Sequence, residues 1–288
     1  MRHLKLEPPN AAPTQNTVEA SAEHSFASLL VASGKGGVGT SVVAALAALT
    51  AAERGETVLL VDATEAGGSL HLLFGVRPTH SVWSLIASGS QPSDVLVPLG
   101  GGLTLVAGGT SGAANVPTTQ DERRAALSRL AHVFSDFDLV VFDGGSRLDS
   151  IAAIGELVDP ALLLVTSADR LALAANYALV KSATTRSSES PISVVANRHG
   201  EKVAEEACEF LVGACDHFLG RTIAVVGVIP DDPCLQAAVG AGMTVRDALD
   251  GSPAADSMRG VLSRVIPSRI ADHRAPSTFP PSPSRRWS

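Results

Sequence analysis

Short, nearly unbroken apolar runs alternate along the chain with longer segments of helical periodicity. Because continuous apolar runs suit strands that are covered on both faces, the alternation predicts an α/β fold. We expect a doubly wound, mostly parallel sheet with helices on both faces. The expected strands are 28–32, 57–61, 103–106, 139–142, 162–166, 192–196 and 223–229. The expected helices are 42–53, 121–134, 149–157, 171–182 and 201–218.

A last helix is expected from Ser252, which can cap it, to Pro267, which should end it; Pro253 suits its first turn. Its apolar side chains share one face: Met258, Val261, Leu262, Val265 and Ile266. We expect this face to pack on the sheet. The alternative is a helix lying on a membrane, with three arginines near anionic lipid: Arg259, Arg264 and Arg269.

The domain organisation follows from composition. Several prolines near each end of the chain disfavour regular secondary structure. Residues 1–25 are therefore expected to be a disordered lead, and residues 269–288 a disordered Pro/Ser-rich tail. Residues 26–268 are expected to form one domain. Hydrophobic residues make up 45% of the chain and aromatic residues only 4%, which predicts a core of Val, Leu, Ile and Ala.

Charge and cysteine content narrow the function classes. The net charge of −7, with no long basic run to offset it, argues against nucleic-acid binding. Three cysteines without close pairing favour free thiols over a disulfide framework or a zinc site, and so a reducing cytoplasm. No apolar run approaches the ~20 residues that cross a bilayer. We therefore expect a cytoplasmic protein, with contact at the inner face of the membrane as an open alternative.

A glycine-rich loop, residues 33–41 with the sequence SGKGGVGTS, joins the first strand to an alanine-rich helix. Such a loop closes backbone N–H groups around phosphate oxygens, and the helix N-terminus adds a positive dipole. Ser41 stands where a hydroxyl would ligate Mg²⁺. Thr40 stands where the usual loop has the lysine that touches the β- and γ-phosphates. A bare strand-to-helix turn is the simpler alternative.

Residues 35–41, KGGVGTS, resemble the deviant Walker A loop of MinD/ParA-type ATPases, and the resemblance extends over roughly residues 27–266. Residues 57–62 resemble the family's second strand, and residues 138–145 resemble its Walker B strand. Residues 194–198 and 226–233 resemble the segments that contact and close over adenine. The resemblance implies a P-loop NTPase fold, ATP or ADP with Mg²⁺, and a nucleotide-dependent homodimer.

The resemblance also assigns roles to residues. It implies Mg²⁺ bound by Ser41 and, through water, by Asp143. It implies a catalytic Lys35 that reaches the partner's phosphates across the dimer, and a weaker catalytic contribution from Asp62. The implied nucleotide-binding residues are Gly34, Lys35, Gly36, Gly37, Val38, Gly39, Thr40, Ser41, Asn197, Arg198, Pro230 and Asp231. Simpler alternatives stay open: a solvated lysine at Lys35, a helix cap at Asp143 and a turn residue at Asn197.

Two positions depart from the family pattern. Thr40 replaces the loop lysine, and Thr64 replaces the second carboxylate of the first switch, which orients the attacking water in the family. Glu65 is adjacent but points differently, so we do not expect it to substitute. Loss of one charge-assisted hydrogen bond should weaken nucleotide binding by roughly ten- to a hundredfold. Loss of both groups predicts weak or absent hydrolysis.

Within the family the chain resembles the FlhG branch, also called FleN or YlxH. The segments that carry this resemblance are 207–220, 227–233, 235–239 and 252–255. It implies a regulator of the placement or number of flagella. Residues 1–26 lack the Asp-Gln-Ala-type segment that acts on the flagellar GTPase FlhF, so that activity is not expected.

Other functions stay open. Thr40 and Thr64 favour a nucleotide-free pseudo-ATPase scaffold. A CpaE/TadZ-like pilus localisation protein ranks second, because those P-loops often lack the lysine; its usual N-terminal domain has little room here. DNA partitioning ranks third, and a dehydrogenase is not expected because the dinucleotide fingerprint is missing. The expected partner is accordingly a flagellar or pilus assembly protein.

Overall fold

The computed structural model describes residues 26–267 except 88, 110–115, 187–189 and 199. The predicted lead and tail lie outside these residues. The strands are β1 (Ala27–Ala32), β2 (Val58–Asp62), β3 (Leu96–Gly100), β4 (Leu103–Val106), β5 (Leu139–Gly145), β6 (Ala161–Thr166), β7 (Ile192–Asn197) and β8 (Ala224–Ile229). The α-helices are α1 (Thr40–Glu53), α2 (Leu70–Leu73), α3 (Gln120–Leu130), α4 (Leu148–Val158), α5 (Arg170–Arg186), α6 (Glu201–Leu219), α7 (Pro233–Gly240) and α8 (Pro253–Val265). Short 3₁₀ helices span Val82–Ile86, Pro92–Val95, Ala131–Asp136 and Arg246–Ala248.

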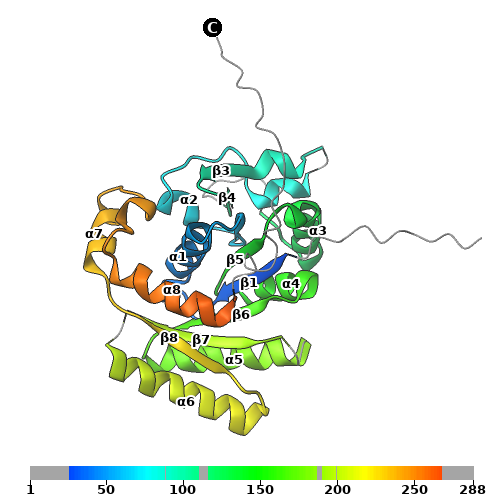
Figure 1. Ribbon diagram of the computed structural model, residues 1–288. Coiled ribbons are helices and arrows are strands. Elements are labelled where there is room, and N and C mark those ends of the chain that lie inside the picture. The colour runs from blue at the N-terminus through cyan, green and yellow to red at the C-terminus, as the bar shows by residue number, and fades with distance from the viewer. Residues whose placement is uncertain (1–25, 88, 110–115, 187–189, 199, 268–288) are drawn as a thin grey trace, which may run out of the picture.

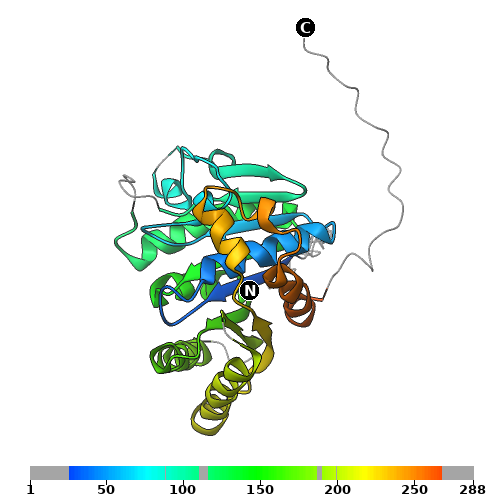
Figure 2. The same ribbon diagram turned by 90° about the vertical axis from the view of Figure 1, so that its left-hand side faces the viewer.

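The strands form one sheet in the order β3-β4-β2-β5-β1-β6-β7-β8. All neighbouring pairs are parallel except β3 with β4. Helices α1 and α8 cover one face, whereas α3, α4, α5 and α6 cover the other (Figures 1 and 2). The predicted doubly wound, mostly parallel α/β fold is therefore confirmed.

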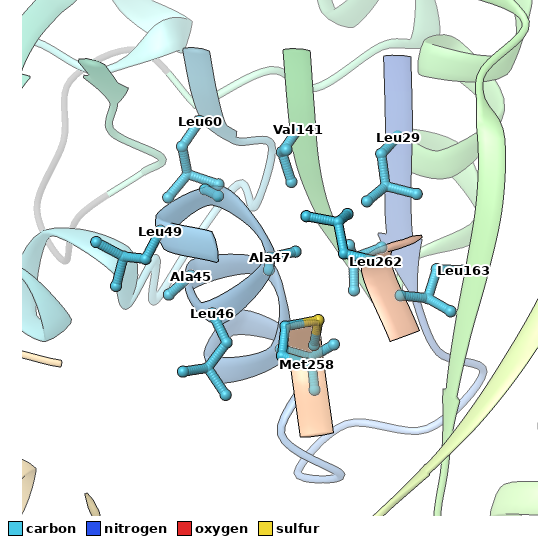
Figure 3. Close-up of a cluster of buried hydrophobic side chains, with 14 of the residues drawn as sticks. Leu29, Ala45, Leu46, Ala47, Leu49, Leu60, Val141, Leu163, Met258 and Leu262 are labelled. Carbon is cyan, nitrogen blue, oxygen red and sulfur yellow. The ribbon is translucent and has the colours of Figure 1, made fainter. Parts of the chain in front are cut away.

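The core on the α1 face explains why the sequence of this helix is almost wholly apolar. Leu46 and Leu49 of α1 are buried, and the alanines between them let the helix approach the sheet closely. Figure 3 shows these side chains beside Leu60 and Val141 of the central strands and Met258 of α8. A helix that is buried all round in this way rigidly positions the loop that precedes it.

Helix α8 begins as the sequence predicts. The Ser252 hydroxyl accepts a hydrogen bond from the Ala255 amide, and Pro253 opens the first turn. Met258, Val261 and Leu262 are buried in the α1-side core. Its arginines are engaged by protein groups; those described are Arg259 and Arg264, which contact Glu53 and the Val226 carbonyl, respectively. The alternative of α8 lying with this face on a membrane is therefore wrong.

Several elements differ from the expectation. Strand β3 was not expected; it pairs antiparallel with β4 at the sheet edge and contains Pro98. Proline is tolerated there because an edge strand leaves one row of amides unpaired. The helix expected at 121–134 ends at Leu130 and continues as a 3₁₀ turn. Helices α2 and α7 were not expected.

Candidate functional site

The glycine-rich loop between β1 and α1 presents its own backbone amides at the start of α1. Gly37 and Gly39 have φ of 85° and 92°, values that side chains other than glycine rarely adopt. Gly34 packs so tightly on α5 that an added Cβ would lie 2.2 Å from backbone atoms of Ala175. These positions explain the glycines, and they give the loop the shape of an anion cradle at the start of α1.

A chain of hydroxyl groups fixes the loop from inside. Thr40 Oγ1 donates to Ser33 Oγ at 2.9 Å, and Ser33 Oγ donates to the Lys35 carbonyl at 2.8 Å. Thr40 is only 7% exposed. The residue that replaces the family lysine therefore ties the loop together, and its side chain is too short to extend across the cradle.

Two buried asparagines hold the loop from distant parts of the chain. Asn176 Oδ1 in α5 accepts from the Gly34 amide at 2.6 Å, and its Nδ2 donates to the Val165 carbonyl. Asn197 Nδ2, at the end of β7, donates to the Val38 carbonyl at 2.8 Å. Asn197 thus contacts the loop directly, while its expected contact with adenine stays a prediction.

A cavity of about 460 Å³ lies over the loop. Its lining comes from four parts of the chain: most of the loop over residues 33–42, the segment after β2 within residues 64–69, the turn after β5 at residues 144–147 with Ser150, and Arg198. Of the predicted nucleotide-binding residues, Gly36, Gly37, Gly39, Thr40, Ser41 and Arg198 line this cavity. The carboxyl ends of several parallel strands are the usual place for a ligand in such a sheet.

Two buried carboxylates stand side by side at the ends of β2 and β5. Asp62 ends β2 opposite Asp143 of β5, and both are fully buried. Burial, and then the charge of Asp62, raise the pKa of Asp143 to about 7, although the nearby Ser41 hydroxyl and the Gly145 amide lower it. Burial also raises the pKa of Asp62, against hydrogen bonds from Thr64 and Leu70.

These groups fit a divalent cation. Among the residues that the structure describes, Oδ2 of Asp143 is a buried oxygen without a hydrogen-bond partner. Carboxylate and hydroxyl oxygens are the ligands that Mg²⁺ prefers, and Ser41, which lines the cavity, lies close to Asp143. The helix-cap alternative for Asp143 is wrong, because the residue before α4 is Arg147 and Asp143 belongs to β5.

The segment after β2 is fixed by hydrogen bonds with groups outside the glycine loop. Thr64 donates to Asp62 Oδ1 through both its amide, at 3.0 Å, and its hydroxyl, at 2.5 Å. Glu65 is buried, where it accepts from Arg123 Nε at 2.5 Å and from Ser150. Burial raises the pKa of Glu65, but Arg123 and its other partners hold it below its usual value. Glu65 is thus engaged by Arg123 and Ser150, and the expectation that it does not substitute for the second carboxylate stays a prediction.

The family model for the CobQ/CobB/MinD/ParA nucleotide binding domain matches residues 29–245. The chain belongs to this family. The antiactivator FleN of Pseudomonas aeruginosa is 25% identical over 244 residues, which are 84% of this chain and 87% of FleN. An uncharacterized ATP-binding protein of Methanocaldococcus jannaschii is 26% identical over 249 residues, 83% of this chain and 87% of that protein.

A solved structure shares the fold. The septum site-determining protein MinD of Pyrococcus horikoshii, complexed with Mg-ADP, superimposes with a TM-score of 0.70 at 18% identity, over 86% of this chain and 98% of that one. The expected MinD/ParA-type P-loop architecture is thereby confirmed, and the match to FleN agrees with the FlhG-type resemblance of the sequence.

In this MinD/ParA-family chain Lys35 is turned to its own subunit. Its Nζ lies 3.1 Å from both oxygens of Asp169, and both side chains are about 40% exposed. The Ser167 hydroxyl, the Ala172 amide and Lys35 hold the pKa of Asp169 well below its usual value. An exposed pair of this kind is weak, so Lys35 is free to leave it. Its catalytic role across a dimer stays a prediction.

The remaining predicted residues lie outside the cavity lining. Gly34 and Val38 serve the loop through their backbone groups. Pro230 and Asp231 follow β8, where Asp231 accepts from Gln236 at 2.5 Å. Their contact with a base stays a prediction.

Sequence reasoning missed Arg147, Asn176 and Asp169. Arg147 could have been found, since it closely follows a strand that ends in the site. Asn176 gave no signal, because it meets Gly34 across 142 positions of sequence.

No helix within the described residues is both long and apolar enough to span a membrane.

Proposed function

We propose that the protein is an adenine-nucleotide-binding switch of the FlhG type that regulates the placement or number of flagella. We propose further that it acts in the cytoplasm and hydrolyses ATP weakly or not at all. The observation that carries the proposal is the glycine cradle whose Ser41 lies near the buried Asp143, with Oδ2 of Asp143 accepting no hydrogen bond from the described residues. Similarity to FleN supports the flagellar role.

The bound state would use groups already in place. The amides of residues 36–41 would hold the phosphates, and Ser41 with Asp143 would hold Mg²⁺, which neutralises phosphate charge. If a dimer closes over the nucleotide, Lys35 would have to break its ion pair with Asp169 and contact the phosphates of the nucleotide bound to the partner subunit.

Weak hydrolysis follows from two side chains. Thr40 provides no cation, and its hydroxyl is engaged by Ser33. Thr64 provides no carboxylate, and its hydroxyl is engaged by Asp62. Phosphoryl transfer depends on charge neutralisation and on a positioned water molecule, so the loss of both groups affects the transition state more than binding.

Thermal shift with Mg-ATP tests the binding step. A ligand that binds only the native state raises the melting temperature, so a rise that saturates with ATP is expected. Phosphate release should be very slow in the wild type and faster in the Thr40→Lys/Thr64→Asp variant. Wild-type turnover equal to that of the double variant would contradict the second half of the proposal.

A nucleotide-free scaffold is the second candidate, favoured by the engagement of Thr40 with Ser33. Under that reading, millimolar Mg-ATP would leave the melting temperature unchanged. Light scattering with and without ATP tests the proposed dimer. Deletion of the gene, followed by counting of flagella and pili in electron micrographs, separates flagellar control from the CpaE/TadZ-like pilus role.

A further inference from the structure

One guanidinium stands at the edge of the cavity in the turn between β5 and α4. Arg147 lines the cavity, and its side chain is 60% exposed. The turn is tied to the loop, because the Ser33 amide donates to the Gly145 carbonyl at 2.9 Å. The turn also touches the glycines: a Cβ added at Gly36 would lie 3.6 Å from Ser146 Oγ. Arg147 is therefore held at the edge of the cradle.

Glu65, the carboxylate that pairs with Arg147, has other hydrogen-bond and charge partners. Arg147 Nε lies 3.4 Å from Glu65 Oε2. Glu65 also pairs with the buried Arg123 at 2.5 Å and accepts from Ser150 at 3.2 Å. Two guanidinium groups thus share the Glu65 carboxylate, and Arg147 is the exposed member of the three. Asp149 and Glu122 act on Arg123 as well, so Arg123 keeps carboxylate partners when Arg147 moves.

The position of Arg147 relative to the carboxylates indicates which part of a nucleotide it faces. It follows Asp143, the proposed cation ligand, by four residues at the end of β5. Arg198 enters the cavity lining from the end of β7, on the Gly39 side of the loop, whereas the turn that carries Arg147 lies against Gly36. Because Mg²⁺ bridges the terminal phosphates of a nucleotide, Arg147 stands on the phosphate side.

We propose that Arg147 supplies the phosphate-binding cation that Thr40 does not. On nucleotide binding, Arg147 releases Glu65, which stays paired with Arg123, and binds the terminal phosphates of ATP. The inference rests on the proposed nucleotide-binding function. Arginine suits this role because its planar fork binds phosphate oxygens in pairs. Because Glu65 belongs to the segment 64–69, which also carries Thr64, the release of Glu65 by Arg147 would link nucleotide binding in the cradle to the conformation of that segment.

Titration calorimetry with Mg-ATP and with AMP tests the phosphate contact. Loss of a charge-assisted hydrogen bond corresponds to about ten- to a hundredfold in affinity. We expect Arg147→Ala to weaken ATP binding by that factor while changing AMP binding less than about twofold, and Arg147→Lys to restore part of the loss. The matched control is Arg124→Ala, a half-exposed arginine of α3 that pairs with Asp121 and Glu156 outside the cavity lining.

A second readout separates phosphate binding from a merely structural role. Trp83 is buried, and its indole Nε1 donates to the Thr64 carbonyl at 2.9 Å, so its fluorescence reports on this segment. The chain has one other tryptophan, Trp287, which a Trp287→Phe background removes. We expect Mg-ATP to change Trp83 emission, and Arg147→Ala to abolish the change even at saturating ATP.

The outcomes are distinct. Affinity of Arg147→Ala for ATP equal to that of the wild type overturns the inference and leaves the proposed function standing. Equal losses of ATP and AMP affinity also overturn it, since they indicate a structural role. No binding of ATP to the wild-type chain overturns the proposed function and the inference with it.

Discussion

Replacing Asp143 by Asn should stabilise the nucleotide-free chain while removing its response to Mg-ATP. The substitution keeps the hydrogen bond in which the Gly145 amide donates to Oδ1 at 3.0 Å. It removes a buried charge that faces Asp62 across the β2–β5 pairing. Fold and hydrogen bonding are conserved, so the change isolates the electrostatic cost of the carboxylate.

The sign and size of the effect follow from the pKa. Burial and Asp62 raise the pKa of Asp143 from 3.8 to about 7. Between these values the folded chain binds more protons than the unfolded chain, so stability falls as pH rises through this window and levels off above it. The difference of about 3 pKa units corresponds to an upper limit of about 4 kcal/mol, at about 1.4 kcal/mol per unit.

Urea unfolding of both chains from pH 4.5 to 8.5, without Mg²⁺ or nucleotide, measures the difference. We expect an advantage for Asp143→Asn of at most about 1 kcal/mol at pH 4.5 that grows to about 2–4 kcal/mol above pH 7. Asp136→Asn, at an exposed carboxylate, should show no such growth. An advantage that does not change with pH, or a loss of stability at pH 8, would refute the reasoning.

Three further changes test other contacts. Ser252→Ala removes the cap of α8 and its hydrogen bond to Asp232, so the free energy of unfolding should fall by about 2 kcal/mol in urea titrations. Arg123→Ala leaves Glu65 buried with weaker partners and should cost about 3 kcal/mol by the same measurement; a cost below 1 kcal/mol would contradict the burial argument. Gly34→Ala forces a Cβ into the backbone of α5 and should lower stability by about 3 kcal/mol and abolish the calorimetric signal for ATP.

The sheet was predictable because its central strands are buried on both faces and therefore read as unbroken apolar runs. Strand β3 was not, since Leu96–Gly100 is partly exposed and contains Pro98. Its register depends on pairing with β4 through the tight turn at residues 100–102, where three glycines have positive φ. Such pairing is a tertiary property that local pattern does not carry.

The loop of the site was predictable because its glycines and Ser41 are contiguous. The contacts that fix it were not. Asn176 and Asn197 reach the loop from 142 and 159 positions away, and nothing in the local sequence of either indicates a hydrogen bond to the loop. The orientation of Glu65 likewise depends on Arg123, which lies 58 positions away on α3.

The paired carboxylates bear on the choice between a switch and a scaffold. Burying Asp62 beside Asp143 disfavours the folded chain near pH 7, as the raised pKa values of both show. A scaffold that never binds a cation would be more stable with an amide or an apolar side chain at either position. A chain that binds Mg²⁺ with nucleotide recovers this cost on binding, and its stability then depends on occupancy. The two buried carboxylates therefore fit the proposed cation-binding switch better than a scaffold that binds no nucleotide.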